Sequence, residues 1–595
     1  MPETPLEPDG ADDVLGRAFD RRLAARLWAT ARPHRRLVWS SLALFPFVAA
    51  AELAQPYLLK VAIDDHILHA DWAGLAAVAA LYAGTLAALY GLRMLEAYLM
   101  ALTGQRVIYD LRSALFAHLL RLEAAYFDRT PVGRLMTRVL NDVEAVSEAF
   151  TSGLFAIVAD VVTVAGVVVM MLWLDWRLAL VTYAIVPVLF AVAAYFRLRA
   201  RDAYREVRRR LARLNAFLQE SLQGMAVIQL FAREAHERQH FARLNQEYRR
   251  ALFGSTVFEA SLYATVEALG SVALALLVWY GGGRILEGAL TFGVLVAFIQ
   301  YTNRFFLPIR DLGAKYTVMQ AAMASAERIF GLLDRPAGIV SPPTPRTPTH
   351  GAGCAAFEGV WFAYEPGRWV LSDCSFTVAP GEHVALVGTT GEGKSTCVRL
   401  LNRTWDVARG RVVVDGVDVR EWDLARLRRH VGIIFQDPVL FTGTVEANLA
   451  LDGDRERAGL ERALQTANAA ALVARLPAGL ATPLVERAAN LSHGERQLLA
   501  IARALVYNPA ILVLDEATSS VDPESEHMIR EAMARLMAGR TTLTIAHRLS
   551  TIQTADRILV LHRGRIHEEG THAALLRQGG LYARLHELGA GAVLG

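Results

Sequence analysis

The sequence predicts two structural parts, an all-α membrane domain of six helices followed by an α/β domain. The chain is 53% hydrophobic, and most of its apolar excess lies before about residue 310, in six long apolar stretches. After a proline-rich segment at residues 335–350, short β-branched runs alternate with helical patterns, which is typical of an α/β domain. The 595 residues are also too many for one domain.

The six apolar stretches favour a chain that crosses a membrane several times. A helix needs about 20 apolar residues to cross a hydrocarbon layer of ~30 Å. The stretches are Leu37–Leu59, Trp72–Leu102, Leu154–Leu174, Leu178–Phe196, Val257–Tyr280 and Phe292–Leu312. A buried helix of a soluble protein is the alternative for any single stretch. Six such stretches in series argue against that alternative for the chain as a whole.

The placement of arginine predicts the orientation of these spans. Arginines gather before the first span and in the long connections at residues 103–153 and 197–256, whereas the other connections are short and nearly uncharged. Cytoplasmic segments carry the excess of Lys and Arg, so we expect both termini in the cytoplasm. We expect the two long connections to be helical arms, which turn at Asp128–Gly133 and near Gly224. Residues 1–36 would form a tail and an amphipathic helix at the membrane surface, with a solvated helix as the alternative.

Ionisable residues inside the apolar stretches have two interpretations. They are Glu52, Arg93, Glu96, Asp160, Glu259 and Glu267. Charges at that depth are costly and face a cavity or a partner. They could therefore line a substrate path, pair neighbouring helices or lie close to the membrane interface. We expect at least one of Glu52, Asp160, Glu259 and Glu267 to line the path.

The second part contains a phosphate-binding motif, G-x-x-x-x-G-K-[ST], at residues 388–396. An apolar run precedes it and a helical pattern follows, so backbone N–H groups and a helix N-terminus would surround a triphosphate. Lys394 would reach the β- and γ-phosphates, and Ser395 would bind Mg²⁺. Gly388, Gly391, Gly393 and Thr396 complete the cradle. A glycine-rich turn without function is the alternative.

A second motif ends an apolar strand, Ile511–Leu514, with two adjacent carboxylates. Asp515 fits a Mg²⁺ ligand, direct or through water. Glu516 stands one residue further, where it could polarise an attacking water. Together with the upstream phosphate-binding loop, this is the layout of a P-loop NTPase.

Several further motifs resemble those of an ABC exporter half-transporter, and their order and spacing agree with that family over about residues 19–590. Tyr364 resembles the aromatic residue that stacks on adenine, and Gln436 the Q-loop glutamine, a further Mg²⁺ ligand. Ser492 and Gly494 resemble the signature loop, and His547 the switch histidine. The resemblance implies that Glu516 and His547 are catalytic, that the cofactors are ATP and Mg²⁺, and that two ATPase domains enclose two ATP molecules between them.

The signature loop departs from the family pattern Leu-Ser-Gly-Gly-Gln. His493 replaces its first glycine and Glu495 its glutamine. An imidazole would crowd backbone that approaches phosphate, and a carboxylate would repel a triphosphate. Glu516 and His547 are nevertheless present. This combination resembles the catalytically competent subunit of a heterodimeric exporter, in which the partner supplies an intact signature.

We therefore expect ATP-driven export of an amphipathic drug, peptide or lipid. The domains would be residues 1–36 (tail and elbow helix), 37–334 (membrane domain), 335–350 (linker) and 351–595 (ATPase domain). The expected partners are a second half-transporter and the lipid bilayer, in a bacterial inner membrane, with both termini cytoplasmic. A homodimeric lipid flippase and an ATP-dependent regulator or channel are the alternatives. The six spans argue against an ATPase of nucleic-acid metabolism.

Overall fold

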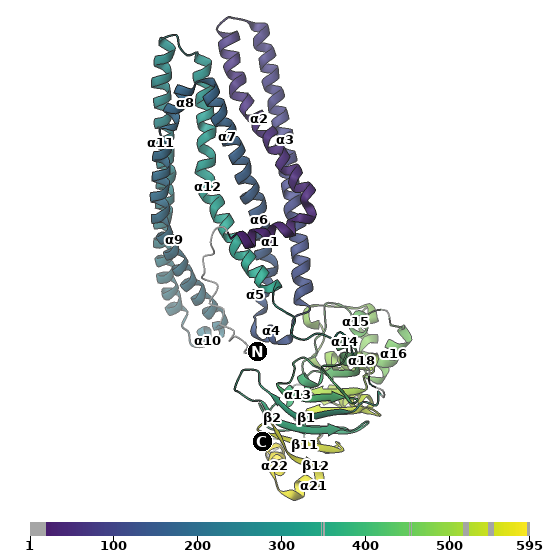
Figure 1. The fold of residues 1–595 in the computed structure, drawn as a ribbon. Coiled ribbons are helices and arrows are strands. Elements are labelled where there is room, and N and C mark those ends of the chain that lie inside the picture. Colours follow the sequence, from purple (N-terminus) through teal and green to yellow (C-terminus); the bar gives the residue numbers. More distant parts are fainter. Residues whose placement is uncertain are drawn as a thin grey trace. The chain divides into compact units, whose positions relative to one another are not determined.

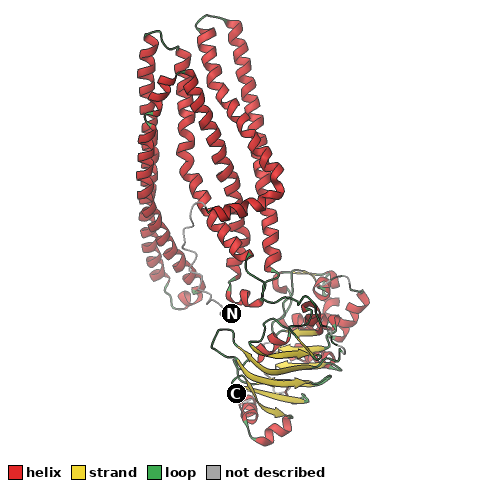
Figure 2. Cartoon of the chain, in the orientation of Figure 1, coloured by secondary structure: helices red, strands yellow, loops and turns green. Residues whose placement is uncertain are grey.

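A computed structural model describes residues 20–346, 348, 351–451, 453, 455–515, 523–545 and 552–591. The chain divides into two compact units. The first, the membrane unit, comprises residues 1–120 and 132–335, and the second, the ATPase unit, comprises residues 121–131 and 336–595. A short piece of the first long connection thus belongs with the ATPase unit. Strands occur in the ATPase unit, whereas the described part of the membrane unit is helical (Figure 2).

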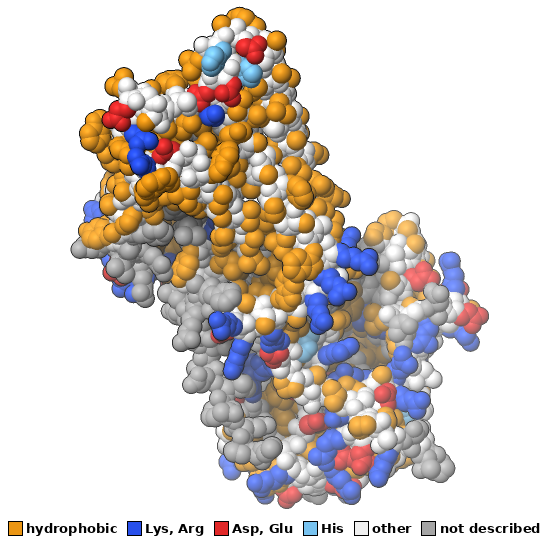
Figure 3. Space-filling model, turned by 45° about the horizontal axis from the view of Figure 1, so that its top comes forward, with side chains coloured by type: hydrophobic (Ala, Val, Ile, Leu, Met, Phe, Trp, Pro, Cys, Tyr) orange, Lys and Arg blue, Asp and Glu red, His pale blue; other side chains and the backbone are white. Residues whose placement is uncertain are grey.

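The membrane unit is built from helices, several of which are long (Figure 1). They are α1 (Arg21–Ala31), α2 (Arg35–Val61), α3 (Trp72–Leu119), α5 (Val132–Thr137), α6 (Val143–Glu148), α7 (Ala156–Leu174), α8 (Trp176–Tyr183), α9 (Val186–Gln223), α10 (Met225–Leu230), α11 (Glu234–Leu286) and α12 (Phe292–Leu333). Helical turns join α2 to Ile67 and make one continuous run from α5 to α7. Hydrophobic side chains cover much of the visible face of this unit (Figure 3).

All six predicted spans coincide with helices, although they differ in regularity. Among the described residues, four helical runs are long and apolar enough to cross a membrane: Arg21–Ile67, Trp72–Leu119, Val132–Leu174 and Glu234–Leu286. The fourth predicted span is divided between α8 and α9, next to Pro187, because proline has no N–H to continue the helix. The sixth lies in α12, which continues through Pro308.

The long connections are helical, but the first turns differently from the prediction. We expected one turn at Asp128–Gly133. The chain does break there, at Thr130 and Pro131, but α3 already ends at Leu119, and a separate short helix, α4 (Ala124–Arg129), lies between the two breaks. In the second connection α9 ends at Gly224 as expected, and α10 adds a further short helix before α11. Each connection therefore has a short helix at its turn.

The amphipathic helix α1 is attached to the membrane unit by both its faces. Leu27 and Ala31 are buried. Arg26 pairs with Asp334 at the end of α12, with N–O distances of 2.5 and 2.7 Å, and its guanidinium lies 4.2 Å from the Phe330 ring centroid. Helix α1 is therefore packed against α12, and its place at the membrane surface stays a prediction.

Sheets form the core of the ATPase unit. The strands are β1 (Ala355–Phe362), β2 (Leu371–Val378), β3 (His383–Val387), β4 (Arg409–Val414), β5 (Val417–Asp418), β6 (Val431–Ile434), β7 (Gly443–Thr444), β8 (Pro483–Leu484), β9 (Ile511–Asp515), β10 (Thr541–Ile545), β11 (Arg557–His562) and β12 (Arg565–Gly570). Within the described residues the core sheet has the order β12-β11-β3-β10-β9-β6, and its strands are parallel except for β12. A second, antiparallel sheet has the order β2-β1-β4-β5.

Helices cover the sheets of the ATPase unit. They are α13 (Lys394–Leu401), α14 (Leu424–His430), α15 (Val445–Ala450), α16 (Arg457–Thr466), α17 (Ala470–Arg475), α18 (His493–Tyr507), α19 (Pro523–Met537), α21 (His572–Gln578) and α22 (Leu581–Gly591). The parallel strands are mostly apolar because both faces of the sheet are buried, as in Val384–Leu386 and Leu512–Val513, which are fully enclosed; the threonines of β10 are buried as well. This α/β architecture confirms the predicted fold class.

Candidate functional site

The phosphate-binding loop joins the buried strand β3 to helix α13. Gly391 and Gly393 have φ angles of 90° and 104°, in the left-handed region that favours glycine, and Gly393 is the N-cap of α13. At Gly388 a Cβ would lie 2.5 Å from the Leu561 carbonyl oxygen. Each glycine is thus required by the backbone, and the loop leaves its N–H groups free of side-chain bulk, which suits a triphosphate.

Lys394 is held inside this loop. Its Nζ donates to the carbonyl oxygens of Gly388 at 2.6 Å and Thr389 at 2.9 Å, and the residue is only 5% exposed. Burial lowers the pKa of Lys394, while the carboxylates of Glu392 and Asp515 act in the opposite direction. The ammonium is therefore a nearly enclosed cation, and phosphate oxygens would satisfy it better than neutral carbonyls.

The first turn of α13 carries the other predicted loop residues. Ser395 is exposed, as a Mg²⁺ ligand requires, and Thr396 is buried. The Thr396 hydroxyl lies 3.1 Å from the hydroxyl of Tyr364, the predicted adenine-stacking residue. Sequence reasoning missed Trp405, whose ring packs edge-on against Tyr364 at 5.0 Å. Tyr364 is thereby fixed beside the phosphate-binding helix.

The phosphate-binding loop contains a carboxylate, Glu392, which is bonded within the loop and to the end of β11. Its Oε1 accepts from the Thr389 hydroxyl at 3.0 Å and lies 3.2 Å from Nδ1 of His562, and the backbone N–H of Arg563 donates to its Oε2. These contacts come from the turn between β11 and β12. The negative charge of Glu392 is thus used to anchor the loop to the core sheet.

The carboxyl ends of the parallel strands bring the second motif to the same edge of the sheet. Ile545 of β10 stands opposite Leu386 of β3 on one side and opposite Asp515 of β9 on the other. Asp515 thus lies one strand away from the phosphate-binding loop, and Gln436 follows the end of β6 on the other side of β9. Asp515, Ser395 and Gln436 would hold Mg²⁺, which would neutralise phosphate charge there.

The two predicted catalytic residues, Glu516 and His547, lie outside the described residues. Glu516 directly follows β9, and His547 follows the end of β10 by two residues. Their strands end at the edge that carries Lys394 and Asp515. The predicted roles of Glu516 as the base and of His547 as a γ-phosphate donor remain predictions.

The signature loop forms the N-terminus of α18, and its contacts correct one expectation. Ser492 is the N-cap, Gly494 is buried, and Glu495 completes a capping box. The Ser492 N–H donates to Glu495 Oε2 at 2.8 Å, and the Glu495 N–H donates to Ser492 Oγ at 3.2 Å. We expected the Glu495 carboxylate to oppose a triphosphate. It turns back onto its own helix instead, because a residue at this position satisfies the free N–H of the N-cap.

His493 is also turned along the helix. Its Nε2 lies 3.1 Å from Nε2 of Gln497, one turn later, and that amide donates to the carbonyl oxygen of Gln436 at 3.5 Å. Gln497 is only 2% exposed. Sequence reasoning missed this glutamine, which joins the signature helix to the Q-loop.

Helix α4 contacts the ATPase core next to Tyr364. Arg129 Nη2 donates to the Tyr364 carbonyl oxygen at 2.7 Å, and Arg399 of α13 pairs with Asp128 at 3.2 Å. The Arg399 guanidinium also lies 5.8 Å from the Tyr364 ring centroid. A segment of the first long connection is thus bonded to both elements that would hold a nucleotide.

The acids of the membrane unit are partly explained by ion pairs. Glu52 of α2 pairs with Arg93 of α3, and Asp160 of α7 pairs with Lys315 of α12. These contacts bear out helix pairing for Glu52 and Asp160. Glu259 accepts from the Tyr204 hydroxyl at 3.4 Å, and Glu267 is exposed in the membrane unit. Glu259 and Glu267 therefore remain the stronger candidates for a path-lining residue.

This assignment predicts different effects for the two groups of acids. Glu52→Gln should destabilise the membrane unit, and the charge exchange Glu52→Arg with Arg93→Glu should restore its thermal stability by re-forming the pair. Glu267→Gln should leave stability unchanged and alter cargo-stimulated ATPase more than basal ATPase. Thermal unfolding and ATPase rates of purified protein measure both. Wild-type behaviour of Glu259→Gln and Glu267→Gln in every assay would show that these acids do not line the path.

A helical membrane unit joined to a nucleotide-binding α/β unit defines the chain as a membrane-bound ATPase. Two family models match it, "ABC transporter transmembrane region" at residues 38–309 and "ABC transporter" at residues 371–519. The chain belongs to the ABC transporters, as an exporter with fused transmembrane and ATPase domains. It is therefore a multi-pass membrane protein whose ATPase domain binds ATP and couples its hydrolysis to transport across the membrane.

Relatives align along almost the whole chain. An uncharacterized ABC transporter ATP-binding protein, YknV of Bacillus subtilis (strain 168), is 36% identical over 97% of this chain and 96% of its own length. An ATP-dependent lipid A-core flippase of Thiobacillus denitrificans is 37% identical over 96% and 98%. The solved structure of a bacterial Atm1-family ABC exporter with ATP bound is 31% identical, covers 93% of this chain and 98% of that chain, and gives a TM-score of 0.76.

Proposed function

We propose that this chain exports an amphipathic compound from the cytoplasmic side of a bacterial cell membrane, with both termini in the cytoplasm. The contact of α4 with Tyr364 carries this proposal. It bonds a segment of the membrane domain's first connection to the residue that would stack on adenine and, through Asp128 and Arg399, to the helix of the phosphate-binding loop. Occupancy of the nucleotide site would therefore act directly on the connection between two spans.

The relatives support the choice of an amphipathic cargo. One relative is named a lipid A-core flippase, and another, YheH of Bacillus subtilis, a probable multidrug resistance transporter. Lipids and many drugs share an apolar body with a polar end.

Transport into inverted membrane vesicles tests the proposal. We expect a fluorescent amphipathic dye to accumulate against its gradient when ATP and Mg²⁺ are present outside the vesicle. The same vesicles carrying the Lys394→Met variant should not accumulate it, because that variant lacks the phosphate-binding charge. An ATP-dependent channel would equilibrate the dye without concentrating it, and that result would replace export by the channel alternative.

We further propose that the chain works with a different half-transporter as its partner. ABC exporters work as dimers, so the partner is either a second copy of this chain or a different half-transporter. The signature loop is the part of the sequence that bears on this choice. Glu495 gives no support to a heterodimer, because its carboxylate has the local role of a capping residue. His493 still gives support, since it places an imidazole at the first position of α18, where the family has glycine.

Exposed apolar residues at two places are consistent with a dimer of either type. Leu230 and Phe231 at the end of α10 are 80% and 73% exposed. On the ATPase unit, Phe435, Val439 and Phe441 are each more than half exposed next to the Q-loop. Apolar surfaces of this kind mark interaction sites.

ATPase measurements on the chain alone and with its candidate partner distinguish the two dimers. In a heterodimer, His493→Gly should change the steady-state rate little, because this signature would serve the slower site. In a forced homodimer the same change should raise the rate. A turnover of the unmutated chain alone that equals that of the pair would reject the heterodimer in favour of a homodimeric flippase.

A further inference from the structure

Helix α1 meets the first span at a corner that is rich in arginine. The corner, residues 20–40, contains α1, a single helical turn at residues 32–34 and the start of α2, and we call it the α1–α2 corner. In Figure 1 α1 lies across the direction of α2 and α3. Five arginines of the corner are exposed: Arg21, Arg22, Arg32, Arg35 and Arg36.

The protein itself does not balance the charge of this corner. With Arg26 the corner carries six arginines, whereas three described carboxylates contact it. Each carboxylate is engaged elsewhere: Asp20 accepts from the backbone N–H of Arg22 at 2.7 Å, Asp110 lies 2.8 Å from His34 Nε2, and Asp334 pairs with Arg26. Counted over the described residues, the corner therefore keeps an excess of positive charge.

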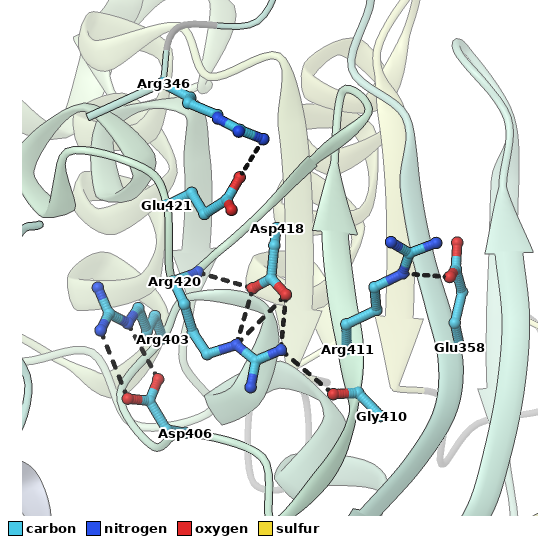
Figure 4. A network of polar contacts seen from close by, with 9 residues as sticks. All are labelled: Arg346, Glu358, Arg403, Asp406, Gly410, Arg411, Asp418, Arg420 and Glu421. Atoms are coloured by element: carbon cyan, nitrogen blue, oxygen red, sulfur yellow. Dashed lines mark hydrogen bonds and ion pairs between the residues drawn. The ribbon is translucent and has the colours of Figure 1, made fainter. Parts of the chain in front are cut away.

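Arginines of the ATPase unit show the contrast. Figure 4 shows four that each face a carboxylate at N–O distances between 2.5 and 2.9 Å: Arg346–Glu421, Arg403–Asp406, Arg411–Glu358 and Arg420–Asp418. Exposed pairs of this kind add little stability, but they neutralise the guanidinium. Within the part of the chain that the structure describes, none of the five exposed arginines of the corner forms an ion pair.

Two exposed tryptophans indicate where the corner would meet a bilayer. Trp39 is 61% exposed and follows Arg35 and Arg36 by four and three residues, so the three side chains share one face of α2. Trp28 of α1 is 41% exposed. Tryptophan gathers at the boundary between hydrocarbon and headgroups. Arg35 and Arg36, one turn or ~5.4 Å before Trp39, would therefore lie at the level of the lipid phosphates.

We propose that the α1–α2 corner is a binding surface for anionic phospholipids, whose headgroup phosphates are held by its exposed arginines. The planar guanidinium pairs with phosphate oxygens, and a zwitterionic headgroup would bring a cation of its own into the cluster. Arg26 fixes α1 to the end of α12 through Asp334 and Phe330. A bound lipid would thus hold the end of the sixth span. Lipid binding here does not depend on which cargo the transporter exports.

Quenching of tryptophan fluorescence by brominated lipids tests the surface in the full-length protein. Nanodiscs of phosphatidylcholine receive increasing fractions of brominated phosphatidylglycerol or, in matched discs, of brominated phosphatidylcholine. The difference between the wild type and Trp39→Phe gives the signal of this corner. We expect phosphatidylglycerol to quench at the lower fraction, and less so as salt is raised.

Removing two arginines of the corner should weaken this preference. Arg35→Gln with Arg36→Gln should lower it about 10- to 30-fold, because each arginine near an anionic surface contributes ~1 kcal/mol and ~1.4 kcal/mol corresponds to tenfold. Arg21→Gln with Arg22→Gln is a second variant with the same expected direction. Melting temperatures identify any variant that does not fold. An unchanged preference in both folded double variants would contradict the proposal.

Two controls separate binding by the corner from a general effect of charge. Arg35→Lys with Arg36→Lys should keep most of the preference, since an ammonium also binds phosphate. Arg238→Gln with Arg243→Gln removes two exposed arginines from α11, at least 14 residues before the apolar stretch that begins at Val257, or about 20 Å at 1.5 Å per residue. This change should leave the preference unaltered. Equal loss in the α11 variant would show an effect of net charge and overturn the surface.

The same assay separates lipid from two other occupants. Neutralising the acidic N-terminal segment, by Asp9→Asn, Asp12→Asn and Asp13→Asn together, should leave the preference unchanged. A preference that appears only in that variant would show that this segment occupies the arginines. Glycerol phosphate in solution should not reverse the quenching, and reversal would indicate a site for soluble phosphates instead. Lys394→Met should keep the preference, which makes this test independent of the export proposal. Equal quenching by the two brominated lipids in the wild type would overturn the proposal.

Discussion

Replacing Lys394 with methionine should weaken ATP binding about 10- to 100-fold. The residue is 5% exposed, and its ammonium donates to the carbonyl oxygens of Gly388 and Thr389 in the phosphate-binding loop. Losing a charge-assisted contact to phosphate costs ~1.5–3 kcal/mol, and each 1.4 kcal/mol is about tenfold in affinity. Direct binding of a fluorescent ATP analogue to purified protein measures the effect.

The choice of methionine isolates the charge from the packing of the side chain. Methionine keeps an unbranched chain of similar length, so the buried stem of Lys394 is largely replaced. Lys394→Ala should show the same loss of affinity together with a lower melting temperature, because it also leaves a cavity. Unchanged affinity in Lys394→Met would show that the ammonium does not contact the phosphates.

Replacing Glu516 with glutamine should lower ATP turnover by about 10²- to 10⁴-fold and leave ATP binding intact. The amide keeps the shape of the side chain but cannot accept a proton from the attacking water. Glu516 directly follows Asp515 at the carboxyl end of β9, at the same edge of the sheet as Lys394. Single-turnover hydrolysis, measured beside equilibrium nucleotide binding, separates chemistry from affinity.

A matched control for Glu516 lies in the helix that follows. Glu526→Gln in α19 also removes one carboxylate, but Glu526 pairs with Arg530 one turn away on the same helix. It should leave turnover near wild type. If Glu516→Gln kept most of the wild-type rate, the general base would have to be another group, with His547 the next to test.

Local motifs could be predicted from the sequence because each depends on the backbone conformation and burial of a few adjacent residues. The glycines of residues 388–393 are required by left-handed backbone and by the close approach of Leu561, and most residues of the buried parallel strands are apolar. The apolar length of the spans follows from the thickness of the membrane. Such requirements act on consecutive positions of the sequence, so the spacing of residue types is enough to identify them.

The direction of a side chain was not predictable in the same way. Glu495 looked like a defect when it was compared with a motif, yet its carboxylate serves the N-terminus of its own helix. The charge of a residue indicates that it will form ionic or hydrogen-bonding contacts. Its rotamer and its neighbours decide which groups it contacts. For this reason Glu495 does not support a heterodimer, and the proposal of a heterodimer depends on His493.

The sequence by itself determined the class of the protein and the order of its two domains, and it predicted the residues of the nucleotide site. Only the tertiary structure decided which distant residues meet. The Glu52–Arg93 pair spans 41 positions, and the bond from Arg129 to the Tyr364 carbonyl spans 235. The core sheet likewise brings together the starts of β6, β9 and β10, which are separated along the chain by about 80 and 30 residues. Partners at such separations are chosen by the packing of whole helices and sheets, which no local pattern of residues encodes.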